Sequence, residues 1–474
     1  MTTTGFRQRR IGSVTCVGSG RVGGKAHNTL GLIDTLKGQN LARVPGTVIL
    51  AKDVVDTFNG DVDTTKEFLT GIQLRTGPVA VRSSGLSEDG KLNCPGVFDT
   101  TFTMLDPRDP LRLAFAVNQV VKSDCSRRAT AYIGRNGLEK GMGLVIQSVV
   151  GSTFLGGSMF GPVFSGVLDT SSVNGNNTMT LSVVLGLGTV AVGGIRSSNL
   201  VILPKGKLLS KTPEIIVHQT YGELLDTSLE GKLTKVELEE LLRLLRFSSL
   251  NDAIRHFLNR YTIPLHLLST AIESQFDGSP VDIEFAVSAS TGAKRLYLLQ
   301  ARKSNMQQVV NENYPEKVEA RKTVSLSRTV LGASTVETTI VVDVQSNDYL
   351  TDAGNGFPAL RKLDSLGKKY ILLIPPEATS SQHENVPLSE LHNLAFLVEK
   401  LTNEQVHDIG LTGIDHISRR AHELGVGYME GFVSLSLLSS SSQLDASIPG
   451  LSIFHGNFGA AVCSATNRGI LYVK

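Results

Sequence analysis

Two polar segments far apart in the chain hold the side chains best suited to binding phosphates and a divalent cation. The first segment, residues 79–85 (VAVRSSG), carries Arg82 from a short apolar run into a stretch of hydroxyls and glycine. A guanidinium group matches two phosphate oxygens at once, so Arg82 is a candidate phosphate ligand. A salt bridge from Arg82 to Glu88 or Asp89 is the purely structural alternative.

The second polar segment consists of two expected strands that meet in a hairpin. Because side chains alternate along a strand, Asp282 and Glu284 share one face of the first strand. By the same rule Leu298, Gln300 and Arg302 are expected on one face of the second strand. Pairing of the strands would place Glu284 beside Gln300, with Arg302 next to them. Carboxylate and amide oxygens suit Mg²⁺, and the polar face of a surface hairpin is the alternative.

A glycine-rich segment near the N-terminus shares features with two phosphate-binding motifs. Residues 18–23 (GSGRVG) have the spacing of a dinucleotide-binding loop between an expected strand and an expected helix. The acidic residue that such a loop needs about 20 positions later is missing, because the next candidate, Asp53, comes too late. The segment is not a P-loop, because Lys25 is followed by alanine. Backbone N–H groups and the Lys25 ammonium still suit a phosphate, and an ordinary tight turn is the alternative.

His416 stands at the start of an expected helix, residues 416–424, which Gly425 ends. The helix dipole disfavours a protonated imidazole at this position. The backbone N–H groups there can instead hold the oxygens of a phosphorylated imidazole. No pair of histidines in the sequence has metal-ligand spacing on a common face, so a zinc site is not expected.

Composition argues against several classes of protein. The 474 residues include 46 lysines and arginines and 44 aspartates and glutamates, and this net charge of +2 argues against a nucleic-acid-binding protein. The longest apolar stretch, residues 183–195, is broken by glycines and too short to cross a membrane. The N-terminal residues lack the apolar core of a signal peptide, and the four cysteines are scattered. A soluble cytoplasmic protein is expected.

The apolar pattern predicts an α+β protein with two units, residues 1–303 and 326–474, joined by a polar linker at 304–325. Strands are expected at 14–17, 48–50, 79–81, 281–286, 295–301, 339–344 and 370–374, with a strand-rich region at 144–202. Helical stretches are expected at 26–37, within 110–135, at 234–247 and at 388–400. The third of these helices begins with a capping box formed by Thr234 and Glu237.

Taken in order, these segments resemble the ATP-binding region of the pyruvate phosphate dikinase and phosphoenolpyruvate synthase family, over roughly residues 20–303. The matching pieces are residues 23–26 (GGKA), 81–84 (VRSS), 95–100 (PGVFDT), 145–150 (VIQSVV), 186–188 (GLG), 282–284 (DIE) and 299–302 (LQAR). The resemblance implies an ATP-grasp fold that binds ATP and Mg²⁺. It implies nucleotide contacts from Lys25, Arg82, Ser83, Ser84, Gly96, Gln147, Gly186, Gly188 and Arg302, and magnesium binding by Glu284 and Gln300.

The segment around His416 resembles the phosphohistidine motif of the same family. Residues 421–425 (AHELG) keep the spacing of that motif, with His422 in place of an arginine. Residues 326–474 are therefore expected to form a smaller α/β swivelling phosphohistidine domain. Two departures stand out: Thr189 replaces a glutamate after Gly-Leu-Gly, and Asp415 directly precedes the histidine.

The resemblance implies an ATP-dependent dikinase-type phosphotransferase, with catalytic roles for His416, Arg82 and Arg302. The phosphoryl group would pass from ATP through a phosphohistidine to an acceptor such as pyruvate or another small molecule. A substrate barrel of about 250 residues does not follow before Lys474, so a separate substrate-domain chain is a possible partner. Two alternatives stay open: a degenerate ATP-binding regulatory subunit, and a direct kinase or ligase without phosphohistidine. A Rossmann oxidoreductase is a distant fourth; no nucleic-acid or membrane partner is expected, and the oligomeric state is left open.

Overall fold

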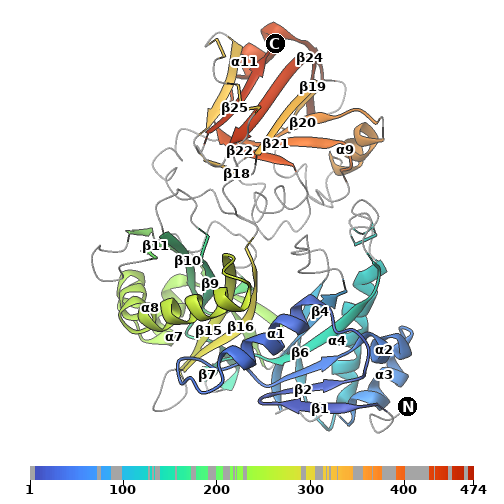
Figure 1. The fold of residues 1–474 in the computed structure, drawn as a ribbon, viewed down its shortest axis with the longest axis vertical. Helices are drawn as coiled ribbons and strands as arrows, with labels where there is room; N and C mark the ends of the chain where they lie inside the picture. Colours follow the sequence, from blue (N-terminus) through green and yellow to red (C-terminus); the bar gives the residue numbers. More distant parts are fainter. Residues whose placement is uncertain are drawn as a thin grey trace. The chain divides into compact units, whose positions relative to one another are not determined.

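The structure is a computed structural model of the 474-residue chain (Figure 1). It describes residues 6–71, 76–86, 99–125, 129–130, 133, 139–154, 157–171, 178–189, 199–205, 214–216, 219, 221–227, 232–289, 295–304, 313–315, 318–319, 322–327, 329–331, 333–344, 356–365, 367–375, 391–400, 426–431, 433–446, 451–463 and 468–474. The chain divides into two compact units. The first contains Met1–Ser171, Met179–Val192 and Ser197–Ser304, and the second is mainly Asn305–Lys474.

The first sheet of unit 1 has six strands and mostly antiparallel pairing. In spatial order they are β1 (Gln8–Ile11), β2 (Val14–Val17), β3 (Thr47–Leu50), β6 (Met142–Ser148), β4 (Gly77–Gly85) and β5 (Thr100–Leu105). Only β2 and β3 run parallel. This pairing differs from the parallel doubly wound sheet of a Rossmann fold.

Successive side chains of a strand point to opposite faces of the sheet, and the strands of this sheet carry apolar residues on both faces. Helices therefore cover both faces. Alternate residues, including Val79 and Val81, pack in a core with α2 (Lys52–Val55), the short 3-10 helix Asp56–Phe58, α3 (Val62–Leu69) and α4 (Pro110–Lys122). On the opposite face, Val145 packs in a core with Ala26 and Leu32 of α1 (Gly24–Thr35). The 3-10 helix Ser123–Cys125 follows α4, and residues 129–130 and 133 are again helical, so the described residues agree with the helical stretch expected within 110–135.

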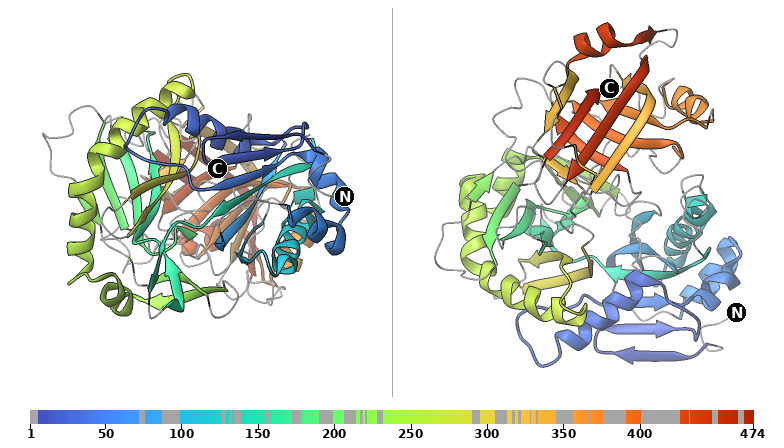
Figure 2. Two further views of the ribbon diagram at one scale, coloured as in Figure 1. Left: turned by 90° about the horizontal axis from the view of Figure 1, so that it is seen from below. Right: turned by 45° about the horizontal axis from the view of Figure 1, so that its top comes forward.

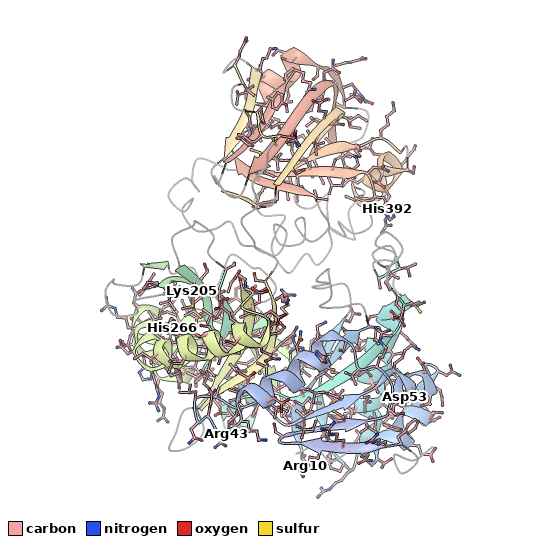
Figure 3. All side chains as sticks on the ribbon, viewed as in Figure 1. Arg10, Arg43, Asp53, Lys205, His266 and His392 are labelled. Atoms are coloured by element: carbon pink, nitrogen blue, oxygen red, sulfur yellow. The ribbon has the colours of Figure 1, made fainter. Side chains whose placement is uncertain are left out.

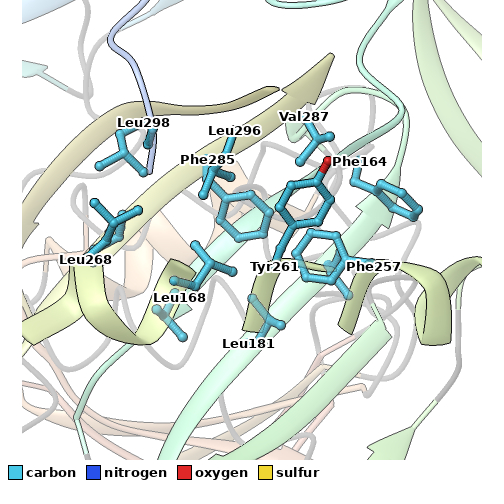
Figure 4. Packing of buried hydrophobic residues seen from close by; sticks show 14 of the residues in the cluster. Phe164, Leu168, Leu181, Phe257, Tyr261, Leu268, Phe285, Val287, Leu296 and Leu298 are labelled. Carbon is cyan, nitrogen blue, oxygen red and sulfur yellow. The ribbon is translucent and has the colours of Figure 1, made fainter. Parts of the chain in front are cut away.

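The second sheet of unit 1 is covered on one face by the long helix α8 (Leu250–Gln275) (Figure 2). Its strands are, in spatial order, β12 (Glu214–Ile216), β11 (Asn199–Pro204), β10 (Thr178–Leu185), β9 (Phe164–Asp169), β15 (Val281–Ser288) and β16 (Arg295–Lys303). Phe164, Phe257 and Phe285 form the centre of the core between sheet and helix (Figure 4). The residues that alternate with this apolar set lie on the opposite face of the sheet.

A third, smaller sheet of unit 1 corrects the helix expected at 234–247. Its strands are β14 (Lys232–Glu237), β13 (Tyr221–Asp226), β8 (Met159–Gly161) and β7 (Ser152–Phe154). Residues 234–237 pair with β13 as a strand, and helix α7 begins only at Leu238 and ends at Leu245. The capping box is therefore wrong: Glu237 is the N-cap residue, and its side chain makes no capping hydrogen bond. Cross-strand pairing outweighed the local helix signal.

Unit 2 is built on one large sheet. Its strands are β17 (Thr323–Ser327), β25 (Arg468–Val473), β24 (Leu451–Cys463), β19 (Ala333–Val344), β20 (Tyr370–Ile374), β21 (Leu394–Lys400), β22 (Gly427–Gly431) and β18 (Thr329–Leu331), with β23 (Gln443–Asp445) beside β24. Strands β19 to β22 run parallel to one another. Helices α9 (Gly356–Asp364) and α11 (Leu435–Ser441) belong to the same unit.

Strand β21 corrects the helix expected at 388–400. Residues 394–400 form a central parallel strand, and residues 391–393 precede it without a helix. An apolar run buried on both faces of a sheet has the same composition as a buried helix, so periodicity alone does not separate them. No helix in the part of the chain that the structure describes is long and apolar enough to cross a membrane.

Candidate nucleotide-binding site

Arg82 joins the two polar segments that the sequence analysis singled out. Its Nη2 donates one hydrogen bond of 2.8 Å to Oε2 of Glu284 and one of 2.7 Å to Oε1 of Gln300. Arg82 comes from β4 of the first sheet, whereas Glu284 and Gln300 come from β15 and β16 of the second. The side chains of Arg82 and Glu284 are only 15% and 16% exposed, so solvent screens this ion pair weakly.

The register of the β15–β16 hairpin sets this arrangement. Glu284 lies opposite Gln300, which confirms the expected pairing, and Asp282 lies opposite Arg302. A β-bulge then shifts the register, so that Leu298 lies opposite Phe285. Leu298 therefore faces the core beneath α8, and the expectation that it shares a face with Gln300 and Arg302 is wrong. Bulges re-aim side chains in this way beside functional sites.

Gln147 lies close to the bulge. Its Nε2 donates to the backbone carbonyl of Leu299, 3.4 Å away, and to Oγ1 of Thr47, 3.3 Å away. Gln147 lies opposite Ala80, which is two positions before Arg82 on β4, so both side chains belong to one face of the first sheet. The structure thus brings Gln147 to the same side as Arg82, and the 4% exposed Gln147 side chain helps to join the two sheets.

The start of helix α1 packs against the same end of β4. Gly23 has a φ of 77°, and a Cβ atom there would lie 2.0 Å from the carbonyl oxygen of Ser84, so this position requires glycine. Oγ of Ser84 accepts a hydrogen bond of 3.0 Å from the N–H of Ala26. Ser84 therefore caps α1 and holds Lys25, in the first turn of that helix, next to the strand that carries Arg82.

Ser83 has a different position from its neighbours. Along β4 it alternates with Arg82 and Ser84, and it shares a face with Val79 and Val81, which pack beneath the helices α2–α4. Its side chain is 1% exposed. The structure therefore does not bring Ser83 together with Arg82.

The glycine-rich segment between β2 and α1 encloses a carboxylate of the chain itself. Oδ2 of Asp53, which is labelled in Figure 3, accepts hydrogen bonds from the backbone N–H and the hydroxyl of Ser19, at 2.9 and 3.2 Å. A Cβ atom at Gly18 or Gly20 would lie 2.5 or 2.8 Å from the other oxygen of this carboxylate. These two glycines thus admit an internal acidic side chain, which sequence spacing alone did not indicate.

The Asp53 carboxylate should make stability depend on acidic pH. Burial opposes its ionisation, but hydrogen bonds from Ser19, Gly20 and Val54 outweigh burial and lower the pKa of Asp53. Because the pKa of Asp53 is lower in the folded than in the unfolded chain, its carboxylate stabilises the fold at pH values above the unfolded pKa of about 3.9. This stabilisation is lost as the pH falls through the folded-state pKa. Asp53→Asn should therefore lower the urea midpoint at pH 7, and the difference from wild type should shrink below about pH 4. A difference that stays constant with pH would contradict this assignment.

The Gly186–Gly188 turn follows β10. Gly186 has a φ of 88°, and a Cβ atom there would lie 2.7 Å from the carbonyl oxygen of Glu223 on β13. That carbonyl also accepts a hydrogen bond of 2.9 Å from the N–H of Leu187. The Thr189 hydroxyl donates to Oε2 of Glu223. A carboxylate therefore lies beside the turn although residue 189 itself is threonine, and no short-range sequence signal indicated Glu223.

Arg302 has a carboxylate partner of its own. Its Nε and Nη2 donate to Oδ2 of Asp282, at 3.2 and 3.1 Å. Asp169 of β9 lies directly opposite Asp282 on the other side of β15. In the sequence Asp282 belongs to the DIE segment without a role of its own, and no local pattern marks Asp169, because residues 165–169 (SGVLD) do not alternate between polar and apolar side chains.

Gly96 and the whole segment around His416, including Asp415, lie outside the described residues. Their expected roles therefore have no geometry here. Among the residues that the structure describes, no three histidine, cysteine, aspartate or glutamate side chains form a cluster able to hold a metal ion.

Comparison with known families identifies the ATP-binding unit. The family model for the AMP/ATP-binding domain of pyruvate phosphate dikinase matches residues 62–323, more than half of the chain. The chain belongs to this family. No curated protein matches it. Membership gives the protein a domain that binds ATP and a role among ATP-utilising, kinase-type phosphotransferases.

The matched region contains most of the proposed nucleotide contacts and excludes two important residues. Inside it are Arg82, Ser83, Ser84, Gly96, Gln147, Gly186, Gly188, Glu284, Gln300 and Arg302. Lys25 precedes the match and His416 follows it. The roles of these two residues therefore rest on their own motifs.

Proposed function

We propose that this protein is an ATP-dependent phosphotransferase of the dikinase type, with an ATP-grasp unit and a swivelling phosphohistidine domain. The observation that carries the proposal is the meeting of Arg82 with both Glu284 and Gln300, through bonds of 2.8 and 2.7 Å. Two segments far apart in the sequence thus converge on one cationic group. Guanidinium groups, hard oxygens and a glycine-bounded helix start are the parts that phosphoryl transfer requires.

The oxygens of Glu284 and Gln300 fit a magnesium ion. Oε2 of Glu284 and Oε1 of Gln300 already converge on a single positively charged nitrogen, which acts as a stand-in for a cation. Mg²⁺ is commonly bound by one or two protein oxygens together with substrate phosphates, so a larger cluster of acidic ligands is not required. Bound there, Mg²⁺ would neutralise charge on the phosphate chain.

The charges near this site lead us to expect that ATP binding requires Mg²⁺. Asp169, Asp282 and Glu284 contribute three carboxylates on one face of the second sheet, against the guanidinium groups of Arg82 and Arg302. Together with Lys25 in the first turn of α1, the cationic groups only balance these three carboxylates, so no excess positive charge is left for the phosphates. The phosphate chain of ATP is itself polyanionic, so we expect ATP to bind weakly unless a divalent cation accompanies it.

We assign a separate role in phosphoryl transfer to each group of residues. Lys25, Arg82 and Arg302 would hold the phosphates in line for attack, because catalysis of phosphoryl transfer is mainly positioning and charge stabilisation. His416 would attack the β-phosphorus of ATP and displace AMP, as the family resemblance implies, and transfer of the terminal phosphoryl group to water would leave the β-phosphoryl group on the histidine. The acceptor would be a pyruvate-like or other small molecule, bound to a separate substrate-domain chain or in a further pocket.

A regulatory ATP-binding subunit is the second candidate function, and direct transfer without phosphohistidine is the third. Both are motivated by Asp415, whose charge would repel a phosphoryl group on the adjacent His416. The other departure, Thr189, weighs less because Glu223 supplies a carboxylate beside the same turn. Direct transfer predicts activity without His416, and the regulatory subunit predicts ATP binding without AMP release.

Incubation with ATP labelled at the β or the γ phosphate tests the proposal. With Mg²⁺ present, acid-labile label from the β position should appear on the chain, with release of AMP in equal amount. Chelation of Mg²⁺ by EDTA should abolish this labelling. Absence of label and of AMP, while ATP still binds, would overturn the dikinase proposal in favour of the regulatory one.

A further inference from the structure

The ion pair between Asp282 and Arg302 is the starting point for an inference about how the site is kept in order. Both Nε and Nη2 of Arg302 donate to the same oxygen, Oδ2 of Asp282. The two side chains are 16% and 7% exposed, so both are largely removed from water. A carboxylate that accepts two N–H groups from one guanidinium restricts the plane of that group as well as its position.

The aspartate has a cross-strand neighbour on each side. Across β15–β16 it lies opposite Arg302, and across β15–β9 it lies opposite Asp169. Oδ1 of Asp169 accepts hydrogen bonds of 2.8 and 2.6 Å from the N–H and the hydroxyl of Ser171. Asp169, Asp282 and Arg302 therefore form a row across three hydrogen-bonded strands, and directly opposed side chains in such a row are close neighbours.

This row lies beside the row that binds Arg82. Glu284 and Gln300 occupy the next same-face positions, two residues along β15 and β16. Each guanidinium near the site thus has a carboxylate of its own: Arg82 bonds to Glu284, and Arg302 bonds to Asp282. If Asp282 lost its charge, Glu284 would be the nearest remaining carboxylate on β15 for Arg302. Arg302 would then pair with the Glu284 oxygens, which would no longer be available to bind a cation.

We propose that Asp282 is a positioning residue that acts through Arg302, holding its guanidinium in place for a phosphate and away from Glu284. The proposal rests on the proposed function, because it assumes that Arg302 contacts the phosphate chain. Fixing a long, flexible side chain before ATP arrives reduces the conformational entropy lost on binding. Asp282 then affects nucleotide binding and turnover without touching the nucleotide.

A double-mutant cycle tests this inference. Asp282→Asn, Arg302→Gln and the double variant should be compared with wild type for the dissociation constant of Mg²⁺–ATP and for the rate of ATP consumption. Displacement of a catalytic group by about 1 Å costs on the order of 10²-fold in rate, and we expect a loss of that order in Asp282→Asn. In the Arg302→Gln background, Asp282→Asn should change neither the dissociation constant nor the rate appreciably, because the guanidinium that Asp282 positions is already absent.

The control is an ion pair in the same unit but on the opposite face of the sheet. Nζ of Lys205, which is labelled in Figure 3, lies 2.7 Å from Oε1 of Glu273 on α8. That glutamate side chain is 15% exposed. Glu273→Gln removes a comparable, partly buried charge and should leave both readouts at the wild-type value. If Asp282→Asn does not fold, Asp282→Glu should replace it in the cycle, since it keeps the charge but displaces the carboxylate.

The outcomes separate the two proposals. A wild-type protein that neither binds nor consumes ATP would overturn the proposed function itself. A wild-type protein that does both, while Asp282→Asn matches it, would overturn only the positioning role. Losses that simply multiply in the double variant would also overturn it, because additive free energies indicate independent structural effects.

Discussion

Arg82→Ala should abolish ATP turnover. The arginine is the only described side chain that bonds to both Glu284 and Gln300, and its removal leaves a largely buried carboxylate without this partner. Loss of an arginine that stabilises the transition state of phosphoryl transfer costs about 10³- to 10⁵-fold in rate. We therefore expect ATP consumption to fall by at least about 10³-fold, measured as AMP release under saturating Mg²⁺–ATP.

Two further variants sharpen this prediction. Arg82→Lys keeps one positive charge but lacks the planar fork of donors, so it should recover only a small part of the activity. Arg112→Ala removes another arginine with a carboxylate partner, Asp109, on α4 at the other face of the first sheet. Both partners in that pair are 42% exposed, and Arg112→Ala should retain full turnover. Normal turnover in Arg82→Ala would refute the whole assignment of the site.

His416→Ala should reduce acid-labile label on the chain to background and leave ATP binding unchanged. The reason is a division of roles: the proposed nucleotide contacts of the described residues lie in unit 1, whereas His416 belongs to the C-terminal sequence motif. A covalent intermediate requires its nucleophile, whereas binding of the nucleotide does not. The measurements are label retained after denaturation and the dissociation constant of Mg²⁺–ATP.

His422→Ala is the matched control, because it removes a second imidazole from the same motif. It should retain the label. Label that persists in His416→Ala but disappears in His422→Ala would move the nucleophile to the other histidine. ATP consumption that continues at the wild-type rate in His416→Ala would instead favour direct transfer.

Local rules predicted the polar hairpin well. Alternation along residues 282–284 and 300–302 was enough to place Glu284 beside Gln300 with Arg302 next to them, since the period of a strand is a local property, whereas the pairing of Asp282 with Arg302 came from the structure. The same rule failed at Leu298, because the register shift of a β-bulge depends on how two strands fit together. The strands expected at 14–17 and 370–374 match β2 and β20 residue for residue.

Errors arose where tertiary contacts outweigh local preference. Residues 394–400 have the apolar character of a buried helix but form a strand, because parallel neighbours bury both of its faces. Residues 234–237 carry the residues of a capping box but pair with β13. In both cases the competing structure depends on partners that are distant in sequence, which a short window of residues does not contain.

The sequence by itself determined which residue types are available for phosphate chemistry, their order along the chain and the family resemblance that the comparison then confirmed. Only the tertiary structure decided that Arg82 reaches Glu284 and Gln300 across two sheets. It alone placed Asp53 in the glycine-rich turn and Asp169 beside Asp282. The physical reason is that alternation and capping act over a few residues, whereas ion pairs between sheets depend on how whole layers pack.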